Sequence, residues 1–222
     1  MKIFCCSDLH GNLISVPENV DLVLIAGDIL PTNIHPRDYF GHMKWLGNEF
    51  RNWLQTITAH KVMSLGNHEI IFEKRPEMIP TNLPIDWKVE GLVEYKGLRI
   101  WLQSHTPRFY DWAFNLDEED LEERWKATPI DIDIVVTHGP PRGYCDHTMR
   151  DGRQGSPSLR DYMCRSDANA LVCGHLHTNY GIEWLSDKAI IGSAICDEYY
   201  FPARQGIVIE YNKGEKVELI SS

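Results

Sequence analysis

The chain has 222 residues, of which 43% are hydrophobic and 24% are charged. This composition is ordinary for a globular protein and excludes a disordered chain, a collagen-like fibre and a coiled coil. The 22 basic and 32 acidic residues give a formal net charge of -10, which argues against binding of extended nucleic acid or of an anionic membrane surface. A small anionic substrate stays compatible with this charge, because a bound metal reverses the sign locally.

The sequence contains no apolar run long enough to cross a bilayer, and its first residues lack the apolar run and cleavage site of a signal peptide. Six cysteines without a C-x-x-C pair predict reduced, mostly buried thiols. We therefore expect a cytoplasmic protein that does not bind membranes. No repeat or linker divides the sequence, so we expect one domain over residues 1–222, and the oligomeric state is left open.

Apolar patterns predict the secondary structure in chain order. Short runs rich in β-branched residues predict buried strands over residues 2–7, 21–26, 61–65, 132–137 and 170–173. Apolar residues spaced by three and four predict a helix over residues 39–57, and an acidic first turn predicts another over residues 116–126. Three hairpins are predicted over residues 92–102, 181–192 and 207–220. The expected fold class is α/β, with two packed, mostly mixed β-sheets flanked by helices.

A cluster of side chains that can bind metal follows each predicted buried strand. The clusters are Asp8-Leu9-His10-Gly11-Asn12, Gly27-Asp28, Gly66-Asn67-His68-Glu69, Thr137-His138-Gly139-Pro140 and Gly174-His175-Leu176-His177. Ligand sites collect beyond the carboxyl ends of parallel strands, so we expect the clusters to converge. A single cluster is more often a turn or a hydrogen-bonded structural group, but five in sequence favour a metal site.

The order D-x-H, G-D, G-N-H-E, H-G and G-H-x-H resembles the motifs of the calcineurin-like metallophosphoesterase superfamily, from Asp8 to His177. The segment Thr137-His138-Gly139-Pro140-Pro141 and the short length most resemble its small metallophosphoesterase-domain phosphodiesterases. This resemblance implies a single metallophosphoesterase domain over residues 1–222. It also implies a β-sandwich flanked by helices, with a dinuclear metal centre at one edge.

The resemblance also implies a ligand set. It assigns Asp8, His10 and His177 to one metal and Asn67, His138 and His175 to the other, with Asp28 bridging the two. The two oxygens of a carboxylate are suited to bridging two cations. A nitrogen and oxygen set without thiolate suits two divalent transition-metal ions, with Mn²⁺ favoured and Fe, Zn²⁺, Co²⁺ or Ni²⁺ as alternatives.

In the family pattern His68 is the catalytic residue that contacts the scissile phosphate and assists the leaving group, which an imidazole does by donating a proton. The alternative is that it only packs beside the cluster. Glu69 is interpreted as a partner of a ligand histidine. Four further residues are candidate substrate-binding groups: Asn12, His105, Arg150 and Arg153. Asn12 alternatively caps a turn, and residues 142–155 alternatively form a solvated, mobile loop.

These assignments predict a binuclear metal-dependent phosphoesterase in which a metal-bridging hydroxide attacks phosphorus in line. The preferred substrate is a small phosphodiester of nucleotide or cyclic-nucleotide type. The Arg that follows the Gly-Asp pair in protein phosphatases of the superfamily is missing, since no Lys or Arg occurs between Asp28 and Arg37. The alternatives are a phosphomonoesterase acting on a phosphoprotein or small molecule, and a catalytically weak interaction scaffold.

Overall fold

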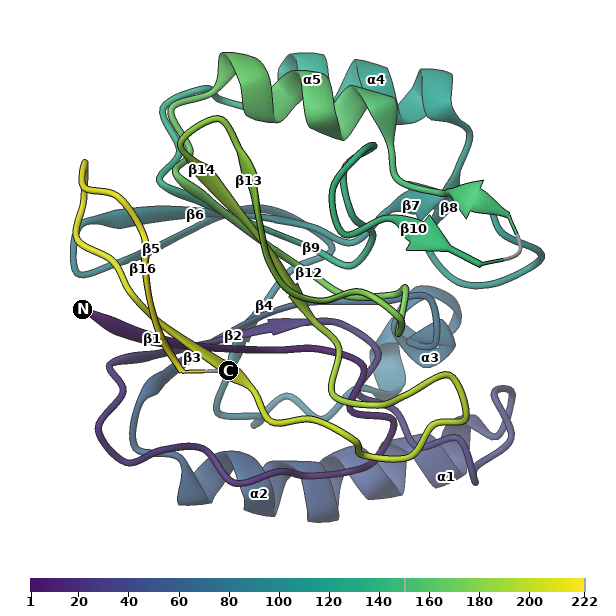
Figure 1. Ribbon diagram of the computed structural model, residues 1–222. Helices are drawn as coiled ribbons and strands as arrows, with labels where there is room; N and C mark the ends of the chain where they lie inside the picture. The colour runs from purple at the N-terminus through teal and green to yellow at the C-terminus, as the bar shows by residue number, and fades with distance from the viewer. Residues whose placement is uncertain (150, 222) are drawn as a thin grey trace.

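Two six-stranded β-sheets pack face to face, and helices cover their outer faces (Figure 1). This computed structural model describes residues 1–149 and 151–221. Helices α1 and α2 lie under the first sheet, and α4 and α5 lie over the second. The four layers confirm the predicted fold class.

The first sheet is parallel in its centre and antiparallel at one side. Its order is β16 (Glu218–Ser221), β15 (Ile207–Glu210), β1 (Lys2–Cys6), β2 (Leu22–Ala26), β3 (His60–Ser64) and β4 (Asp86–Trp87). Strands β1 to β4 are parallel, whereas β15 is antiparallel to both β1 and β16. The first three predicted strands therefore form neighbouring parallel strands, so their carboxyl ends lie at one edge.

The second sheet has the same mixed character. Its order is β13 (Tyr180–Leu185), β14 (Lys188–Ser193), β12 (Ala170–Cys173), β9 (Ile134–Thr137), β6 (Leu98–Gln103) and β5 (Glu90–Tyr95). Strands β14, β12, β9 and β6 are parallel, and the edge strands β13 and β5 are antiparallel hairpin partners. All five predicted buried strands and all three hairpins are confirmed, with their ends shifted slightly.

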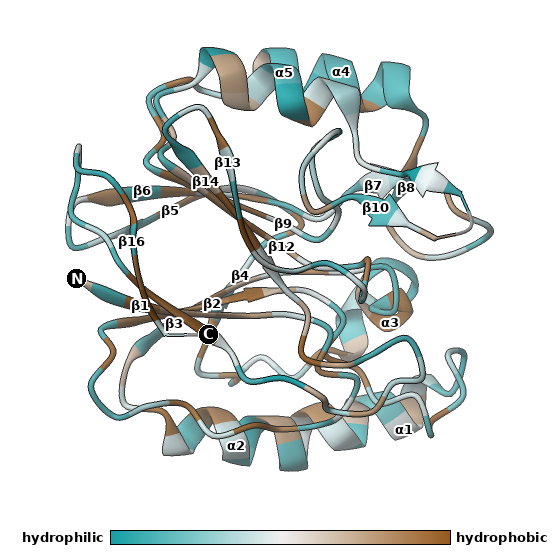
Figure 2. Ribbon diagram, in the orientation of Figure 1, coloured by the Kyte–Doolittle hydropathy of each residue, from teal (hydrophilic) through white to brown (hydrophobic). Residues whose placement is uncertain are grey.

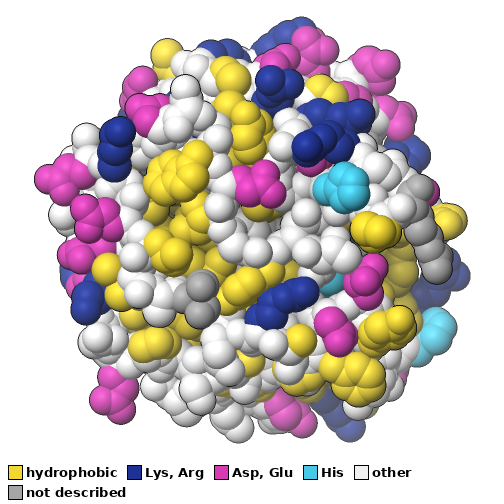
Figure 3. Space-filling view, in the orientation of Figure 1, with side chains coloured by type: hydrophobic (Ala, Val, Ile, Leu, Met, Phe, Trp, Pro, Cys, Tyr) yellow, Lys and Arg dark blue, Asp and Glu magenta, His cyan; other side chains and the backbone are white. Residues whose placement is uncertain are grey.

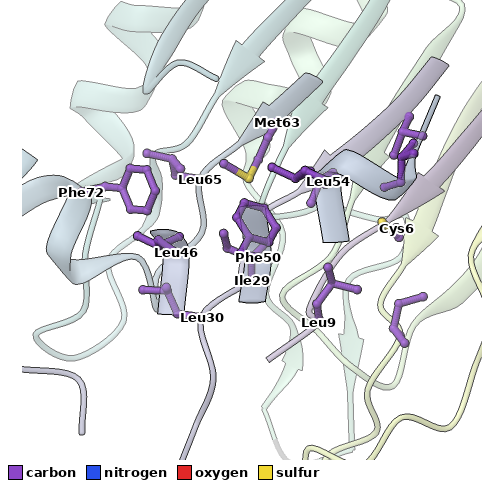
Figure 4. Packing of buried hydrophobic residues seen from close by; sticks show 14 of the residues in the cluster. Cys6, Leu9, Ile29, Leu30, Leu46, Phe50, Leu54, Met63, Leu65 and Phe72 are labelled. Atoms are coloured by element: carbon purple, nitrogen blue, oxygen red, sulfur yellow. The ribbon is translucent and has the colours of Figure 1, made fainter. Parts of the chain in front are cut away.

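The predicted helix over residues 39–57 is continuous but contains a wider turn. It consists of α1 (Tyr39–Trp45), a π-helical segment (Leu46–Phe50) and α2 (Arg51–Thr56). The side chain of Asp38 accepts a hydrogen bond from the backbone N–H of Gly41 and so caps its start. The apolar stripe packs on the first sheet, and Figure 4 shows Phe50 and Leu54 in one cluster with Met63 of β3.

Over the second sheet, α4 (Glu118–Ala127) confirms the predicted acidic helix, and α5 (Pro157–Arg165) was not predicted. Helix α5 begins with ordinary start signals: the Ser156 side chain accepts a hydrogen bond from the backbone N–H of Leu159, and Pro157 occupies the first helical turn. The remaining short elements were also not predicted. They are α3 (Ile70–Lys74), a 3₁₀ turn (Pro76–Met78), β7 (Thr106–Pro107) with β8 (Asn115–Leu116), and β10 (His147–Thr148) with β11 (Gly152–Arg153). The last pair forms a short antiparallel ladder of residues 147–148 with 152–153, within a segment for which a solvated loop was one expectation.

Three apolar layers hold the elements together, one between the sheets and one under each pair of helices. Figure 2 shows the hydrophobic colouring concentrated on the strands and on the inner sides of the helices. All six cysteines are free and five are buried, as predicted. Within residues 1–149 and 151–221, no helix is both long and apolar enough to span a bilayer.

Candidate metal centre

The five clusters meet at one edge of the sandwich, beyond the carboxyl ends of β1, β2, β3, β9 and β12. Backbone hydrogen bonds join neighbouring clusters: the Asp8 N–H donates to the Gly27 carbonyl at 3.0 Å, and the Gly174 N–H donates to the His138 carbonyl at 2.9 Å. The His175 N–H donates to both carboxylate oxygens of Asp8 at 3.1 and 3.0 Å, which ties the second sheet to the first. The structure therefore brings the predicted residues into one place.

The backbone at this edge is strained. Asp8, His10, Asp28 and His175 have positive φ angles of 53°, 44°, 54° and 68°. A residue other than glycine in this left-handed region costs roughly 1–2 kcal/mol. Such outliers concentrate at functional sites, where the surrounding fold holds side chains in place at the expense of stability.

Two glycines allow the loops that carry the clusters to lie close to the carboxylates of Asp8 and Asp28. A Cβ atom at Gly66 would overlap the Asp28 carboxylate, and one at Gly174 would overlap the side chains of Asp8 and Ser7. No larger residue fits either position without moving a carboxylate. The glycines beside these clusters are therefore needed for the geometry of the acidic side chains.

The first group of possible ligands consists of Asp8, His10 and His177. The Nε2 atom of His177 lies 3.2 Å from both Asp8 Oδ1 and His10 Nε2. Its Nδ1 atom lies 2.7 Å from the Asp197 carbonyl oxygen, to which it donates. That bond directs the lone pair of Nε2 toward the group, as is usual for a metal-ligating histidine.

A second group is formed by Asp28, His138 and Asn67. His138 Nδ1 donates to the Ala26 carbonyl at 2.8 Å, and its Nε2 lies 2.9 Å from Asn67 Oδ1 and 3.3 Å from Asp28 Oδ2. The same Asp28 oxygen lies 3.8 Å from His10 Nε2 of the first group. The other oxygen of Asp28 accepts the His68 backbone N–H at 2.8 Å. One carboxylate oxygen thus faces both groups.

The electrostatics of these side chains suit divalent cations. Burial lowers the pKa of His10 and of His175 to about 4, so both imidazoles are neutral at pH 7 and carry a free lone pair. Burial alone would raise the pKa of Asp8, but the hydrogen bond with His177 and the charge of His138 lower it to about 2. Asp8 is fully buried, and a buried carboxylate is costly unless a cation offsets its charge. The donor set therefore fits a pair of transition-metal ions.

Comparison with known proteins identifies the family. A family model described as calcineurin-like phosphoesterase matches residues 1–179. The chain belongs to this family. The human metallophosphoesterase domain-containing protein 1 is 27% identical over an alignment of 243 residues, which covers 94% of this chain and 70% of that protein.

Two solved structures share the fold of this phosphoesterase. A dimetal phosphatase from Danio rerio aligns with a TM-score of 0.59 and 10% identity, covering 99% of this chain and 98% of the other. A novel archaeal phosphodiesterase aligns with a TM-score of 0.50 and 16% identity, covering 100% of each chain. Membership of the family indicates a dimetal-dependent phosphoric ester hydrolase, and the groups described above are its candidate ligands.

The two remaining predicted residues lie beside these groups. The ring of His175 is centred 5.0 Å from that of His138. His68 stacks on Trp112 with ring centroids 4.4 Å apart, and its Nε2 atom lies 3.9 Å from Asp28 Oδ2. Because His10, Asp28 and His68 also form a possible ligand group, the position of His68 is compatible with either a catalytic or a ligating role.

The interpretation of Glu69 as a partner of a ligand histidine is wrong. Its buried carboxylate accepts four backbone N–H groups, those of Asp28, Ile29, Leu30 and Gly66, at 2.7, 3.0, 3.2 and 2.6 Å. Burial and the neighbouring Asp28 charge raise the pKa of Glu69 to about 7. The side chain thus holds the loop that carries Asp28, a role that no local sequence signal reveals.

Three of the four candidate substrate-binding residues are engaged elsewhere. Asn12 Nδ2 donates to the Leu9 carbonyl at 2.9 Å, which is the turn-capping alternative. His105 Nδ1 lies 2.7 Å from Gln103 Oε1, and Arg153 pairs with Asp146 at 2.6 Å. None of these three lines the cavity over the centre. Arg150 lies outside the described residues.

A cavity of about 240 Å³ opens over the centre. Its lining side chains are those of Asp28, Asn67, His68, Phe109, Trp112, Thr148, His175, Leu176, His177, Thr178, Glu198 and Tyr200. Of these, Phe109, Trp112 and Tyr200 were not predicted. They come from loops that are distant in sequence, so only the folded chain brings them together.

One of these loops also orients a candidate ligand histidine. Asp197 accepts the backbone N–H groups of Tyr199 and Phe201 at 2.9 and 3.0 Å, while its carbonyl accepts His177 Nδ1. The turn holds Tyr200 at a φ of 66°, with its ring 4.7 Å from that of His10. The same loop thus orients His177 and places an aromatic ring over the centre.

Proposed function

We propose that this protein is a binuclear metal-dependent phosphodiesterase. The observation that carries the proposal is the Asp28 carboxylate, whose Oδ2 atom lies 3.8 Å from His10 Nε2 and 3.3 Å from His138 Nε2. Asp8, His10 and His177 would hold one cation, Asn67, His138 and His175 the other, and Asp28 both. When bound, such ions, with Mn²⁺ favoured, lower the pKa of water and neutralise charge on phosphoryl oxygens.

His68 is the proposed proton donor to the leaving oxygen. Its Nε2 atom lies 3.9 Å from Asp28 Oδ2. Two contacts hold His68 in place: its backbone N–H donates to Asp28 Oδ1, and its ring stacks on Trp112. An imidazole held in this way can donate a proton to a leaving oxygen.

The cavity supports a preference for diesters. Among the described residues, its lining contains no Lys or Arg, whereas Glu198 adds an acidic group. A monoester dianion carries one more charge than a diester, and a bidentate Arg is the common device for binding it. We therefore place a phosphomonoesterase second. A catalytically weak scaffold ranks below both, because the ligand set is complete.

Partners and location form part of the same proposal. On the face shown in Figure 3, basic side chains are interspersed with acidic ones rather than gathered into a track, which disfavours extended nucleic acid as a substrate. The free cysteines support a reducing, cytoplasmic environment. Pairing of β15 with β1 supports a single domain that extends beyond residue 179.

The test is a ratio of specificity constants. We expect the Mn²⁺-reconstituted protein to show a higher kcat/KM for bis-para-nitrophenyl phosphate than for para-nitrophenyl phosphate. A clear preference for the monoester would reject the diesterase proposal. Elemental analysis should find about two ions per chain, and full activity with a single ion would reject the binuclear centre.

A further inference from the structure

A second cavity adjoins the first at His68. It has a volume of about 160 Å³. Its lining side chains are those of Leu30, Pro31, Thr32, Ile34, Pro36, His42, His68, Trp112 and Tyr200. His68, Trp112 and Tyr200 line both cavities, so the two cavities meet at these three side chains.

The size and walls of this cavity suit one flat ring. An apolar cavity of about 150 Å³ in a protein holds a benzene molecule, and the space here is nearly the same. Most of the wall is aliphatic or aromatic, since Leu30, two prolines and Ile34 line it together with Trp112 and Tyr200. Such walls bind a planar group through its faces.

One buried polar group faces this apolar space. His42 is only 2% exposed, and neither of its ring nitrogens has a hydrogen-bond partner among the described residues. The backbone of Ile34 lies near the ring without completing a hydrogen bond of normal geometry. An unpaired buried polar group costs roughly 1–3 kcal/mol, and a ring nitrogen or oxygen of a ligand would remove that cost.

We propose that the second cavity is the leaving-group subsite, and that it takes a single planar ring bearing a hydrogen-bond acceptor or donor. The inference rests on the proposed diesterase function and on the place of His68, which lines both cavities. The retained ester group would then lie in the first cavity, beside Phe109.

The reaction balances with one water molecule. Water oxygen forms a bond to phosphorus, and the bond between phosphorus and the ring-bearing oxygen breaks. That oxygen takes the proton from His68, and a proton of the water restores His68. The products are a phosphomonoester and an alcohol, so no oxidant or further reactant is required.

The first experiment uses two diesters with the same leaving group, bis-para-nitrophenyl phosphate and methyl para-nitrophenyl phosphate. Ile34→Trp fills the subsite, so kcat/KM should fall at least about tenfold for both substrates. Phe109→Ala should lower kcat/KM for the bis-aryl diester only. Ile130→Trp, at a site 51% exposed over the second sheet, is the matched control and should change neither.

The second experiment tests His42 without filling the space. His42→Phe keeps a ring but removes both nitrogens, so kcat/KM should fall about fivefold for methyl para-nitrophenyl phosphate and stay unchanged for methyl phenyl phosphate. Circular dichroism checks that each variant is folded. Equal losses on both substrates would show that His42 serves the structure only.

Ligand-observed NMR with para-nitrophenol separates the two proposals. Contacts with the wild-type protein that disappear in Ile34→Trp support the subsite, even if the protein hydrolyses neither diester. Hydrolysis that Ile34→Trp leaves unchanged, or lowers only for the bis-aryl diester, overturns the leaving-group assignment while the diesterase function stands.

Discussion

At the scale of single residues, Asp28 is the carboxylate that faces both groups of candidate ligands. Asp28→Asn keeps the shape but removes the charge shared by both groups, so we expect activity to fall roughly a hundredfold or more and metal content to fall at both sites. Elemental analysis and kcat/KM measure the two effects. Asp161→Asn on the exposed face of α5 is the control. Loss of only one ion with most activity retained would contradict the bridging role.

Substitution of His68 distinguishes a metal-binding role of this residue from a catalytic one. His68→Ala should retain metal while kcat falls by about 10²–10⁴. For an ester whose leaving alcohol has a lower pKa, His68→Ala should lower kcat by a smaller factor, because departure of that alcohol needs less proton assistance. Measurement of kcat for both proteins, across aryl diesters whose leaving groups differ in pKa, tests this dependence. If His68→Ala strips metal instead, the residue is a ligand, as the group with His10 and Asp28 permits.

At the scale of elements, the loop after β2 depends on Glu69. Glu69→Gln replaces one acceptor oxygen with a donor that faces backbone N–H groups. We expect a loss of about 1–3 kcal/mol in the free energy of unfolding, measured by urea denaturation, together with weaker metal binding. Glu77→Gln, on an exposed side chain, should change neither quantity. Normal metal affinity in Glu69→Gln would show that the loop holds Asp28 without this carboxylate.

The loop after β12 depends on the absence of a side chain. Gly174→Ala would push against Asp8 and Ser7, so we expect about 1–3 kcal/mol of destabilisation and reduced metal content. Gly47 lies inside the π-helical segment, and a Cβ atom there would meet only Pro80, at 3.7 Å. Gly47→Ala should therefore be neutral or stabilise the protein by up to about 1 kcal/mol. Thermal unfolding of both variants makes the comparison.

The elements show what the sequence can predict. Buried strands and their glycine-bounded clusters are local signals, and the parallel order of β1, β2 and β3 makes those signals converge. The roles of Glu69 and Tyr200 depend on contacts with distant segments, so no local pattern contains them. The short helix α5 carries its signal in Ser156-Pro157, which is readable but too brief to stand out from a loop.

At the scale of the whole molecule, the candidate ligands come from both sheets. Asp8, Asp28 and Asn67 follow strands of the first, and His138, His175 and His177 follow strands of the second. A bound ion therefore stabilises the packing of one sheet on the other. We expect Mn²⁺ to stabilise the chelator-treated protein by about 2.7 kcal/mol for each site at a hundredfold excess over Kd. Calorimetry measures the shift in Tm, and an unchanged Tm would contradict a centre that links the sheets.

The pairing of β1 with β15 has a consequence for how the protein matures. Asp8 follows strand β1 in the sequence, yet β15, which pairs with the free side of β1, lies near the opposite end of the described chain. Until the two meet, β1 presents unpaired backbone groups and the apolar sequence Lys2–Cys6. Such an open edge invites pairing with another chain. Newly made molecules would therefore be most prone to aggregation before closure, and the exposed strand is one that leads into the candidate metal centre.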